Sequence, residues 1–240
     1  MTEMITSKRM PHAAGDRHTI YTEVAYIFGI ILTALGTALI ALSEIGVALP
    51  LVSAHVIHGL LHEHHWITLG LVEIGCQAVL FLILSIIFRH IKRAFLISMA
   101  TSVIYAAFLD LFLMIFGAFD ETLAARIIFF VLGFFIFALG ETFFHYTYIQ
   151  PEFYEFFCHS LSEKWGFRFF RVKFAFELTL CLVGIAISFI FHGLGAVHGL
   201  GIGTLICAAL TINTSHLFAK IIAKHCTFRD GLKWRKFFVE

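Results

Sequence analysis

Charge is scarce in this sequence. Only 14% of its 240 residues are Asp, Glu, Lys or Arg, whereas 60% are hydrophobic and the mean hydropathy is +0.90. A soluble domain of this size could not bury so much apolar surface, so the composition excludes a water-soluble fold and indicates a membrane protein. The formal net charge of +1 also argues against a nucleic-acid partner, because neutralising phosphates requires a basic surface.

Paired cysteines, catalytic motifs and long polar loops are missing as well. The five cysteines have neither the spacing of a zinc site nor that of a disulfide framework. The sequence contains no Ser/His/Asp arrangement, no zinc-protease helix and no nucleotide-binding motif, and its loops are too short for a soluble catalytic domain. We therefore expect that the protein is not an enzyme and has no cofactor.

Long apolar runs make up most of the chain. A bilayer core about 30 Å thick is crossed by about 20 apolar residues in a helix. Six stretches are long enough, with centres near Ala34, Val79, Ala106, Phe135, Val183 and Leu210. The first is too long for a cleaved signal peptide. The expected fold is therefore an all-α, six-span protein of the cell membrane.

Basic residues gather in alternate loops. They lie in 89–93, between the second and third expected spans, in 164–173, between the fourth and fifth, and in the C-terminal stretch 220–236. The remaining three loops contain no Lys or Arg: 46–66, 117–125 and 192–199. The positive-inside rule therefore predicts that both termini lie in the cytoplasm.

The two halves of the chain correspond to each other at a nearly constant spacing. At 104 residues, and at 103 for the last two pairs, the matches are Gly29 with Gly133, Gly36 with Gly140, Ser43 with Thr147, His55 with His159, Glu73 with Glu177, Thr101 with Thr204 and Asp110 with Asn213. Because each half holds three spans, the second copy must be inverted in the membrane. We expect inverted repeats at 23–116 and 117–223, between a cytoplasmic segment, 1–22, and a basic cytoplasmic tail, 224–240.

Glu73 and Glu177 are the leading candidates for a functional site. Each lies about two turns into an apolar span, where an ionised carboxylate costs several kcal/mol unless it faces a partner or water. Matched positions in inverted repeats suit alternating proton or substrate sites. The simpler alternative is a hydrogen-bonded residue that only fixes helix packing. Asp110 and Asn213, in the third and sixth spans, are secondary candidates.

Both halves break their helical pattern at equivalent places. Ser43 precedes a break that contains Pro50, and Thr147 precedes one that contains Pro151. Proline lacks a backbone donor and the residue before it avoids helix, so polar backbone groups are freed there. In a membrane such groups must be covered by protein or line a wet cavity. The segments near these prolines are therefore expected to be re-entrant helices that shape a substrate- or proton-binding site, or amphipathic helices on the bilayer surface. In the first case the site includes Ser43, Thr147, Pro50 and Pro151.

Histidine is abundant, with 14 residues, five of which lie between positions 55 and 65. His55, His58 and His62 follow the spacing i, i+3, i+7, which places them on one face of a helix. Neutral imidazoles in this arrangement could bind zinc, copper or nickel. The alternative is an uncharged polar surface at the outer interface.

The glycine pattern resembles that of the YczE/YitT-type bacterial membrane proteins. The likeness lies in 29–50, in 94–113 and in the run Gly193-Leu-Gly-Ala-Val-His-Gly-Leu-Gly-Ile-Gly-Thr204, and it covers about residues 23–223. Similar proteins have an acidic residue beyond the proline of the first break, where this chain reads Leu-Val-Ser-Ala-His. The resemblance implies a multi-span, transporter-like protein and assigns no substrate.

Together these patterns favour a small-solute transporter or exporter that uses Glu73 and Glu177 at the interface of the repeats. Its expected partners are the lipid bilayer and a small molecule or ion, and a homo-oligomer is compatible with the sequence. Two alternatives stay open. One is a membrane accessory or binding protein that transports nothing, and the other is a divalent-metal permease that uses the histidine cluster.

Overall fold

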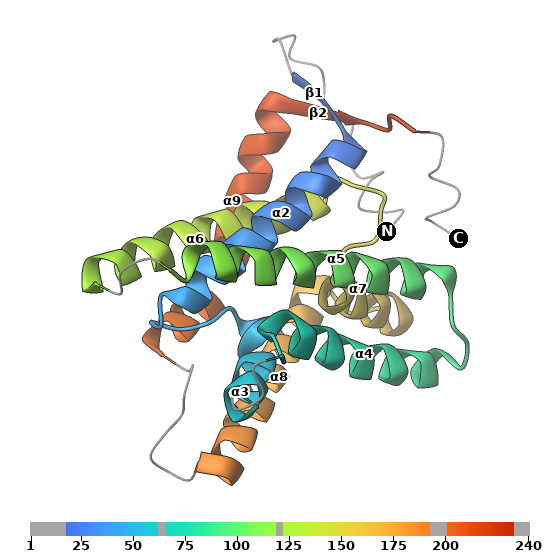
Figure 1. Cartoon of the computed structure of the whole chain (residues 1–240). Coiled ribbons are helices and arrows are strands. Elements are labelled where there is room, and N and C mark those ends of the chain that lie inside the picture. Colours follow the sequence, from blue (N-terminus) through green and yellow to red (C-terminus); the bar gives the residue numbers. More distant parts are fainter. Residues whose placement is uncertain (1–17, 62–65, 119–121, 193–200, 233–240) are drawn as a thin grey trace.

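Long helices dominate the computed structural model, which describes residues 18–61, 66–118, 122–192 and 201–232 (Figure 1). Two short strands and a 3-10 helix, η1, accompany them. The elements follow in the order β1 (His18–Tyr21), α2 (Thr22–Leu42), η1 (Leu49–Leu51), α3 (Val52–Leu60), α4 (Leu69–Phe88), α5 (Arg93–Phe116), α6 (Leu123–Phe144), α7 (Phe153–Trp165), α8 (Phe169–His192), α9 (Ile202–His225) and β2 (Cys226–Arg229).

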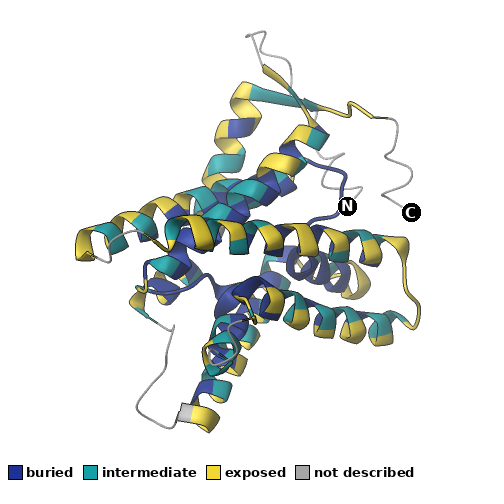
Figure 2. Cartoon of the chain, in the orientation of Figure 1, coloured by how far each residue is buried: buried dark blue, intermediate teal, exposed yellow. Residues whose placement is uncertain are grey.

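Five of the described helices are long and apolar enough to cross a membrane, namely α2, α4, α5, α6 and α8. Helix α9 is a sixth if its two segments, Ile202–Thr211 and Asn213–His225, which meet at 42°, form one span. Each expected span centre lies within one of these six helices. Exposed residues cover the outer faces of the long helices (Figure 2), and many of them are large and apolar, as a lipid environment requires. The expectation of a helical membrane protein is confirmed at this level.

A close crossing of α2 and α6 forms the centre of the molecule. A Cβ atom on Gly36 would lie 2.4 Å from the backbone nitrogen of Phe137, and one on Gly133 would lie 2.9 Å from that of Ile40. Further along, Gly29 faces the ring of Phe144. As residue numbers increase along α2, the residue numbers of its contacts on α6 decrease. The two helices therefore run antiparallel. Only glycine allows the backbones to approach this closely.

The other helices pack around this pair. Helix α5 lies along α2, and α9 lies along α6. Each short helix packs both against the long helix that follows it in sequence and against a long helix of the other half, so that α3 contacts α4 and α8, and α7 contacts α8 and α4. The short helices are therefore held between long helices, which explains why most of α7 is buried (Figure 2).

A hydroxyl group from α9 satisfies the backbone at the first break. Ser43 Oγ accepts a hydrogen bond from the Ile45 amide at 3.2 Å, and Thr204 Oγ1 accepts one from the Val47 amide at 3.0 Å. The Gly203 amide donates to the Ile45 carbonyl at 3.1 Å. The freed backbone groups are therefore covered by protein, and Pro50 lies in the first turn of the short helical stretch η1.

The second break is held in a similar way by α5. Thr147 Oγ1 accepts a hydrogen bond from the Ile149 amide at 3.1 Å. Thr101 Oγ1 donates to the Gln150 carbonyl at 3.0 Å, and Ser98 donates to the Pro151 carbonyl at 2.7 Å. Pro151 lies just before α7. Ser43 and Thr147 thus fix the backbone at the two breaks.

The described ends of the chain meet in a small parallel sheet. His18 pairs with Cys226 at one end of the sheet and Tyr21 with Arg229 at the other. The sequence pattern did not predict this pairing, because segments of four residues are too short to show a strand period. The sheet places the N-terminal end of α2 beside the residues that follow β2, where Thr22 Oγ1 donates to Asp230 Oδ1 at 3.2 Å (Figure 1).

Candidate functional site

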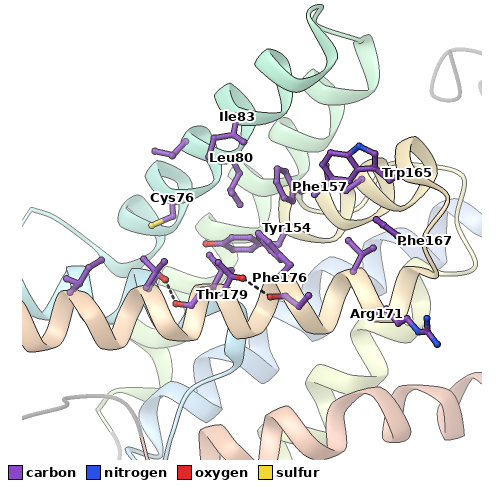
Figure 3. Close-up of a pocket in the computed structure, with 18 of the residues that line it drawn as sticks. Cys76, Leu80, Ile83, Tyr154, Phe157, Trp165, Phe167, Arg171, Phe176 and Thr179 are labelled. Atoms are coloured by element: carbon purple, nitrogen blue, oxygen red, sulfur yellow. Dashed lines mark hydrogen bonds between the residues drawn. The ribbon is translucent and has the colours of Figure 1, made fainter.

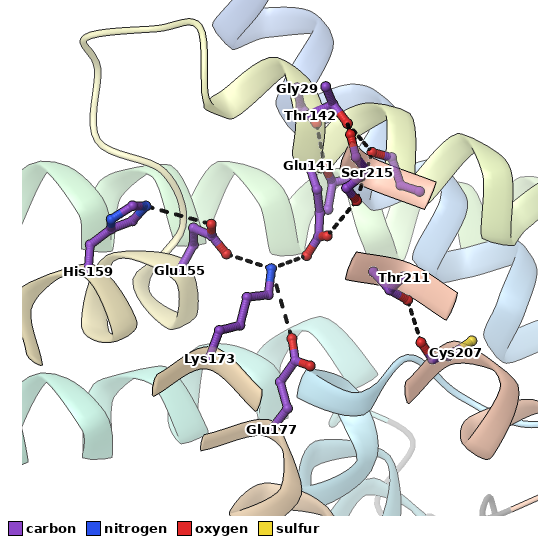
Figure 4. A network of polar contacts seen from close by, with 12 residues as sticks. Gly29, Glu141, Thr142, Glu155, His159, Lys173, Glu177, Cys207, Thr211 and Ser215 are labelled. Atoms are coloured by element: carbon purple, nitrogen blue, oxygen red, sulfur yellow. Dashed lines mark hydrogen bonds and ion pairs between the residues drawn. The ribbon is translucent and has the colours of Figure 1, made fainter. Parts of the chain in front are cut away.

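A lysine ammonium surrounded by carboxylates lies inside the molecule (Figure 4). Lys173 Nζ is 2.7 Å from Glu141 Oε1 and 2.8 Å from Glu155 Oε2. A third carboxylate, Glu177 Oε1, lies at 3.9 Å. The four side chains come from α6, α7 and α8, and each is at most 12% exposed. Ser215 of α9 extends this Lys173 network through a contact of 3.4 Å with Glu141.

The Lys173 network contains more acids than bases. If all four groups were ionised, one positive charge would face three negative charges. Buried charge that lacks a partner is costly, so the excess must be neutralised by protons or by a bound cation. Ionisable groups this close share their protons and titrate as a unit. The arrangement can therefore take up and release protons.

Glu155 connects the Lys173 network to a histidine on α7. Its Oε1 lies 3.7 Å from His159 Nε2, and the His159 ring stacks on Phe169 with the ring centroids 3.9 Å apart. Burial opposes ionisation of the Glu155 carboxyl, but the Lys173 ammonium, helped by His159, outweighs it and lowers the pKa to about 2. Burial lowers the pKa of His159. The expected state is an ionised Glu155 beside a neutral imidazole.

His145, Glu155 and His159 could hold a metal ion. One ligand atom from each lies within 4.8 Å of the other two. Two imidazoles and a carboxylate form a ligand set that zinc and iron accept. However, the Lys173 ammonium already binds one oxygen of Glu155, and its charge opposes a second cation at the same carboxylate.

The histidines that the sequence suggested as metal ligands lie elsewhere. His55 and His58 are on α3, and His62 is outside the described residues. Burial lowers the pKa of His55, and its Nδ1 has no hydrogen-bond partner among the described residues. The described residues of this segment thus offer a neutral imidazole on a helix that is packed between α4 and α8.

Glu73 belongs to a second polar cluster, where α4 meets α7. It is 1% exposed. Its Oε1 accepts a hydrogen bond from Gln77 Nε2 at 3.2 Å, and its Oε2 accepts one from the Tyr154 hydroxyl at 3.3 Å. Gln77 Oε1 in turn accepts from the Phe153 amide at 3.0 Å and from Ser102. The Glu73 cluster therefore contains neutral donors and, among the described residues, no basic partner.

Glu152 interacts with both groups of acids. It precedes α7 and is 9% exposed, and its carboxylate is repelled by Glu73 on the one hand and by Glu141 and Glu155 on the other. Burial, followed by the charge of Glu73, raises the pKa of Glu152 well above its ordinary value. Its Oε2 is buried and has no hydrogen-bond partner among the described residues. Glu152 is therefore expected to hold a proton between the two groups.

The predicted pair is buried but divided between the two clusters. Glu177 faces Lys173, whereas Glu73 faces Tyr154 and Gln77. The secondary candidates lie apart from both. Asp110 accepts hydrogen bonds from the Thr68 hydroxyl and the Gly70 amide, at 2.6 and 2.8 Å, and so anchors the start of α4. Asn213 is exposed on α9, next to the bend.

Three basic residues lie in helices and not in the expected loop, and two acids were overlooked. In the stretch 164–173, Lys164 lies in α7 and Arg171 in α8, and Lys173, also in α8, is 6% exposed. Its burial is possible because three carboxylates surround the ammonium. Glu152 and Glu155 were overlooked because they follow Pro151 in a segment interpreted only through its backbone. The acidic residues in that short buried segment were the available signal.

Long apolar helices around a buried charged network define an integral membrane protein. A family model matches residues 20–220, most of the chain, and the chain belongs to this family, DUF6198, a family of unknown function. Comparisons with curated proteins and with solved structures give no match. The resemblance to YczE/YitT-type proteins stays a prediction, and much of its glycine run, 193–200, lies outside the described residues.

Proposed function

We propose that this protein is a small-solute transporter or exporter of the cell membrane, driven by protonation of buried carboxylates. The observation that carries the proposal is the excess of acids around Lys173. Three carboxylates from three helices share one ammonium, and Glu152 and Glu73 add two more acids nearby. A structural ion pair needs no such excess, whereas a proton-driven site does.

The order of the helices supports two repeats. Each half has a long helix, a short helix and two more long helices, namely α2, α3, α4 and α5, then α6, α7, α8 and α9. The central contacts also occur in matched pairs. The contact of Gly29 with Phe144 corresponds to that of Gly133 with Ile40, at a spacing of 104 residues. A two-fold relation between antiparallel helices produces this exchange of partners.

The two breaks give independent support. Thr204 of α9 bonds to the backbone of the first break, and Thr101 of α5 bonds to that of the second. These threonines occupy matched positions in the two halves, and each acts on the break of the opposite half. We therefore propose inverted repeats with both termini in the cytoplasm, and a transport pathway where α7 packs against α4 and α8.

The Lys173 network offers a way to couple protons to movement. In the described state its ammonium joins Glu141 of α6 to Glu155 of α7. A proton that neutralises either carboxylate would weaken one of these links. Removing one partner of a buried ion pair costs about 3–5 kcal/mol. An energy of this size shifts an equilibrium between two conformations by at least about a hundredfold.

Reconstituted protein provides the test. Proteoliposomes adsorbed on a solid-supported membrane would receive steps of pH and of a panel of amines, sugars, organic acids and divalent cations. We expect charge movement with at least one class, and its loss in Glu177→Gln and in Glu73→Gln. The matched control is Glu163→Gln, because Glu163 is an exposed acid of α7.

Two results would contradict the proposal. One is wild-type protein that gives no current with any class of solute and no uptake of protons. The other is unchanged transport in both glutamine variants. The first result together with a stable protein partner on purification would favour the accessory protein instead.

A further inference from the structure

An apolar groove lies between α4 and α8, beside α7 (Figure 3). Its volume is about 780 Å³. One wall is a face of α4 that includes Leu80 and Ile83, the other is a face of α8 that includes Phe176 and Val183, and Tyr154 of α7 points into it (Figure 3). Ile83 and Val183 are exposed, at 41% and 44%. The groove is therefore open along its side, toward the surface that the lipid chains cover.

The polar groups in the wall are already used. Thr179 Oγ1 donates to the Ala175 carbonyl at 2.8 Å, and Ser53 Oγ donates to the Leu180 carbonyl at 2.8 Å. The Tyr154 hydroxyl donates to Glu73. Because these donors are satisfied within the protein, the wall offers little to a polar solute, and an occupant must be apolar over most of its length.

A cation lies at one end of the groove. Arg171 is the charged residue of its lining, and Trp165 and Phe167 lie at the same end (Figure 3). The structure shows no ion pair of Arg171 with any described carboxylate. Aromatic rings and arginine gather where hydrocarbon meets lipid headgroups, and guanidinium binds phosphate through two parallel hydrogen bonds. The groove thus combines a long apolar wall with a site for an anion at its end.

We propose that the groove binds one acyl chain of an anionic phospholipid from the surrounding bilayer, with the phosphate at Arg171. Half of the hydrocarbon core is about 15 Å thick, or about ten helical residues. Counted from Arg171 along α8, this distance ends near Leu180, beyond Phe176. The chain length of one leaflet therefore fits the groove, and the lateral opening lets the lipid enter without leaving the membrane.

The lipid would also touch the Glu73 cluster. Tyr154 lines the groove and holds Glu73 through its hydroxyl. An acyl chain against the Tyr154 ring would restrict the motion of that ring. It would thereby fix the position of the Tyr154 hydroxyl, which is a hydrogen-bond partner of Glu73. The lipid site does not depend on the proposed transport, because it rests on the shape and charge of the groove alone.

Quenching of Trp165 fluorescence by brominated lipid tests the site. Trp66→Phe and Trp234→Phe leave Trp165 as the only tryptophan of the full chain. The protein is placed in phosphatidylcholine bilayers that contain brominated phosphatidylglycerol or brominated phosphatidylcholine. We expect phosphatidylglycerol to occupy the site about five times more readily, which is the selectivity that one arginine gives near an anionic surface.

Two variants separate binding in the groove from general attraction to the membrane. Arg171→Gln should abolish the preference for phosphatidylglycerol. Arg168→Gln removes a charge nearby that does not line the groove and should leave the preference intact. Equal quenching by the two lipids in the wild type, or the same preference in Arg171→Gln, would overturn the proposal.

A second measurement examines the apolar wall. Thr179→Trp places a bulky ring in the groove, whereas Leu178→Trp places one on the exposed face of α8, where Leu178 is 47% exposed. Mass spectrometry of purified protein should detect retained phosphatidylglycerol in the wild type and in Leu178→Trp, and at least a fivefold loss in Thr179→Trp. Equal retention in all three proteins would also overturn it.

Discussion

Replacing Lys173 with methionine should destabilise the protein and reverse the effect of acid on its stability. The methionine side chain is apolar and of similar length, so it fills the space of the lysine stem. However, it leaves Glu141, Glu155 and Glu177 facing one another without a cation. Breaking one side of a buried ion pair costs about 3–5 kcal/mol, because the remaining charge keeps its desolvation cost.

The pKa of Glu155 gives a second measure of the same effect. In the wild type the ammonium overcomes burial and lowers the pKa from 4.5 to about 2. At 1.36 kcal/mol for each pKa unit, this difference corresponds to roughly 3 kcal/mol. Because the folded pKa is below the unfolded one, this stability is present above about pH 4.5 and is lost as the pH falls toward 2.

Without the ammonium, the shift in the pKa of Glu155 changes sign. Burial is then opposed only by the weaker effects of His159 and His145, and it raises the pKa of Glu155 above 4.5, so the folded state binds the proton more tightly than the unfolded state. The stability that Glu155 contributes should therefore be lost in acid in the wild type, whereas in Lys173→Met protonation of the same carboxyl should make acid stabilising relative to neutral pH. Thermal unfolding in detergent, followed from about pH 2 to pH 8 by tryptophan fluorescence, measures both effects.

Two control variants test whether the loss of any lysine would have the same effect and whether uncompensated negative charge is the cause. Lys220→Met removes an exposed lysine of α9 and should change the midpoint little. Glu155→Gln in the Lys173→Met background removes one uncompensated charge and should restore part of the lost stability. Equal midpoints for wild type and Lys173→Met at neutral pH, or parallel pH profiles, would refute the reasoning.

Two further substitutions test the contacts that hold the fold. Gly36→Ala should lower the unfolding free energy by about 1–3 kcal/mol, because the new Cβ atom would lie 2.4 Å from the Phe137 nitrogen. The control is Gly59→Ala, whose Cβ atom meets nothing within 4 Å. Equal unfolding midpoints for the two variants would contradict the prediction. Thr204→Val should cost about 1–3 kcal/mol, because the Val47 amide loses its acceptor. Thermal unfolding measures it, and an unchanged midpoint would show that another group accepts this hydrogen bond.

Hydropathy was enough to place the long helices. The expected centres, from Ala34 to Leu210, each lie in one of them, because about 20 apolar residues in a row satisfy both the helix and the bilayer. Internal comparison also identified positions that act alike. Thr101 and Thr204 were matched by spacing alone, and each bonds to a broken segment in the structure.

The Lys173 network could not be predicted in the same way. Hydropathy treats a lysine as a loop residue, and only the fold shows that α6, α7 and α8 bring three carboxylates around it. Glu155 lies 18 residues from Lys173 in sequence and Glu141 lies 32. The correspondence between the two halves, at a spacing of 104 residues, did not point to Lys173 either. The matching position in the first half, residue 69, is leucine. The network belongs to one half of the molecule.

This asymmetry bears on how the molecule could work. If inverted repeats formed two equal sites, the half with Glu73 would also contain a lysine, but the described residues around Glu73 offer only neutral donors. One half therefore holds a lysine paired with carboxylates, and the other holds Glu73 without a basic partner among the described residues. Glu152 interacts electrostatically with the acids of both clusters. All of these acids are buried: Glu155 and Glu152 are each 9% exposed, Glu177 is 5% exposed and Glu73 is 1% exposed. Under the proposed function, one proton relay through Glu152 fits this asymmetry better than two equal gates do. Glu152→Gln is then the variant that should block proton exchange between Glu73 and the Lys173 network while leaving both clusters folded.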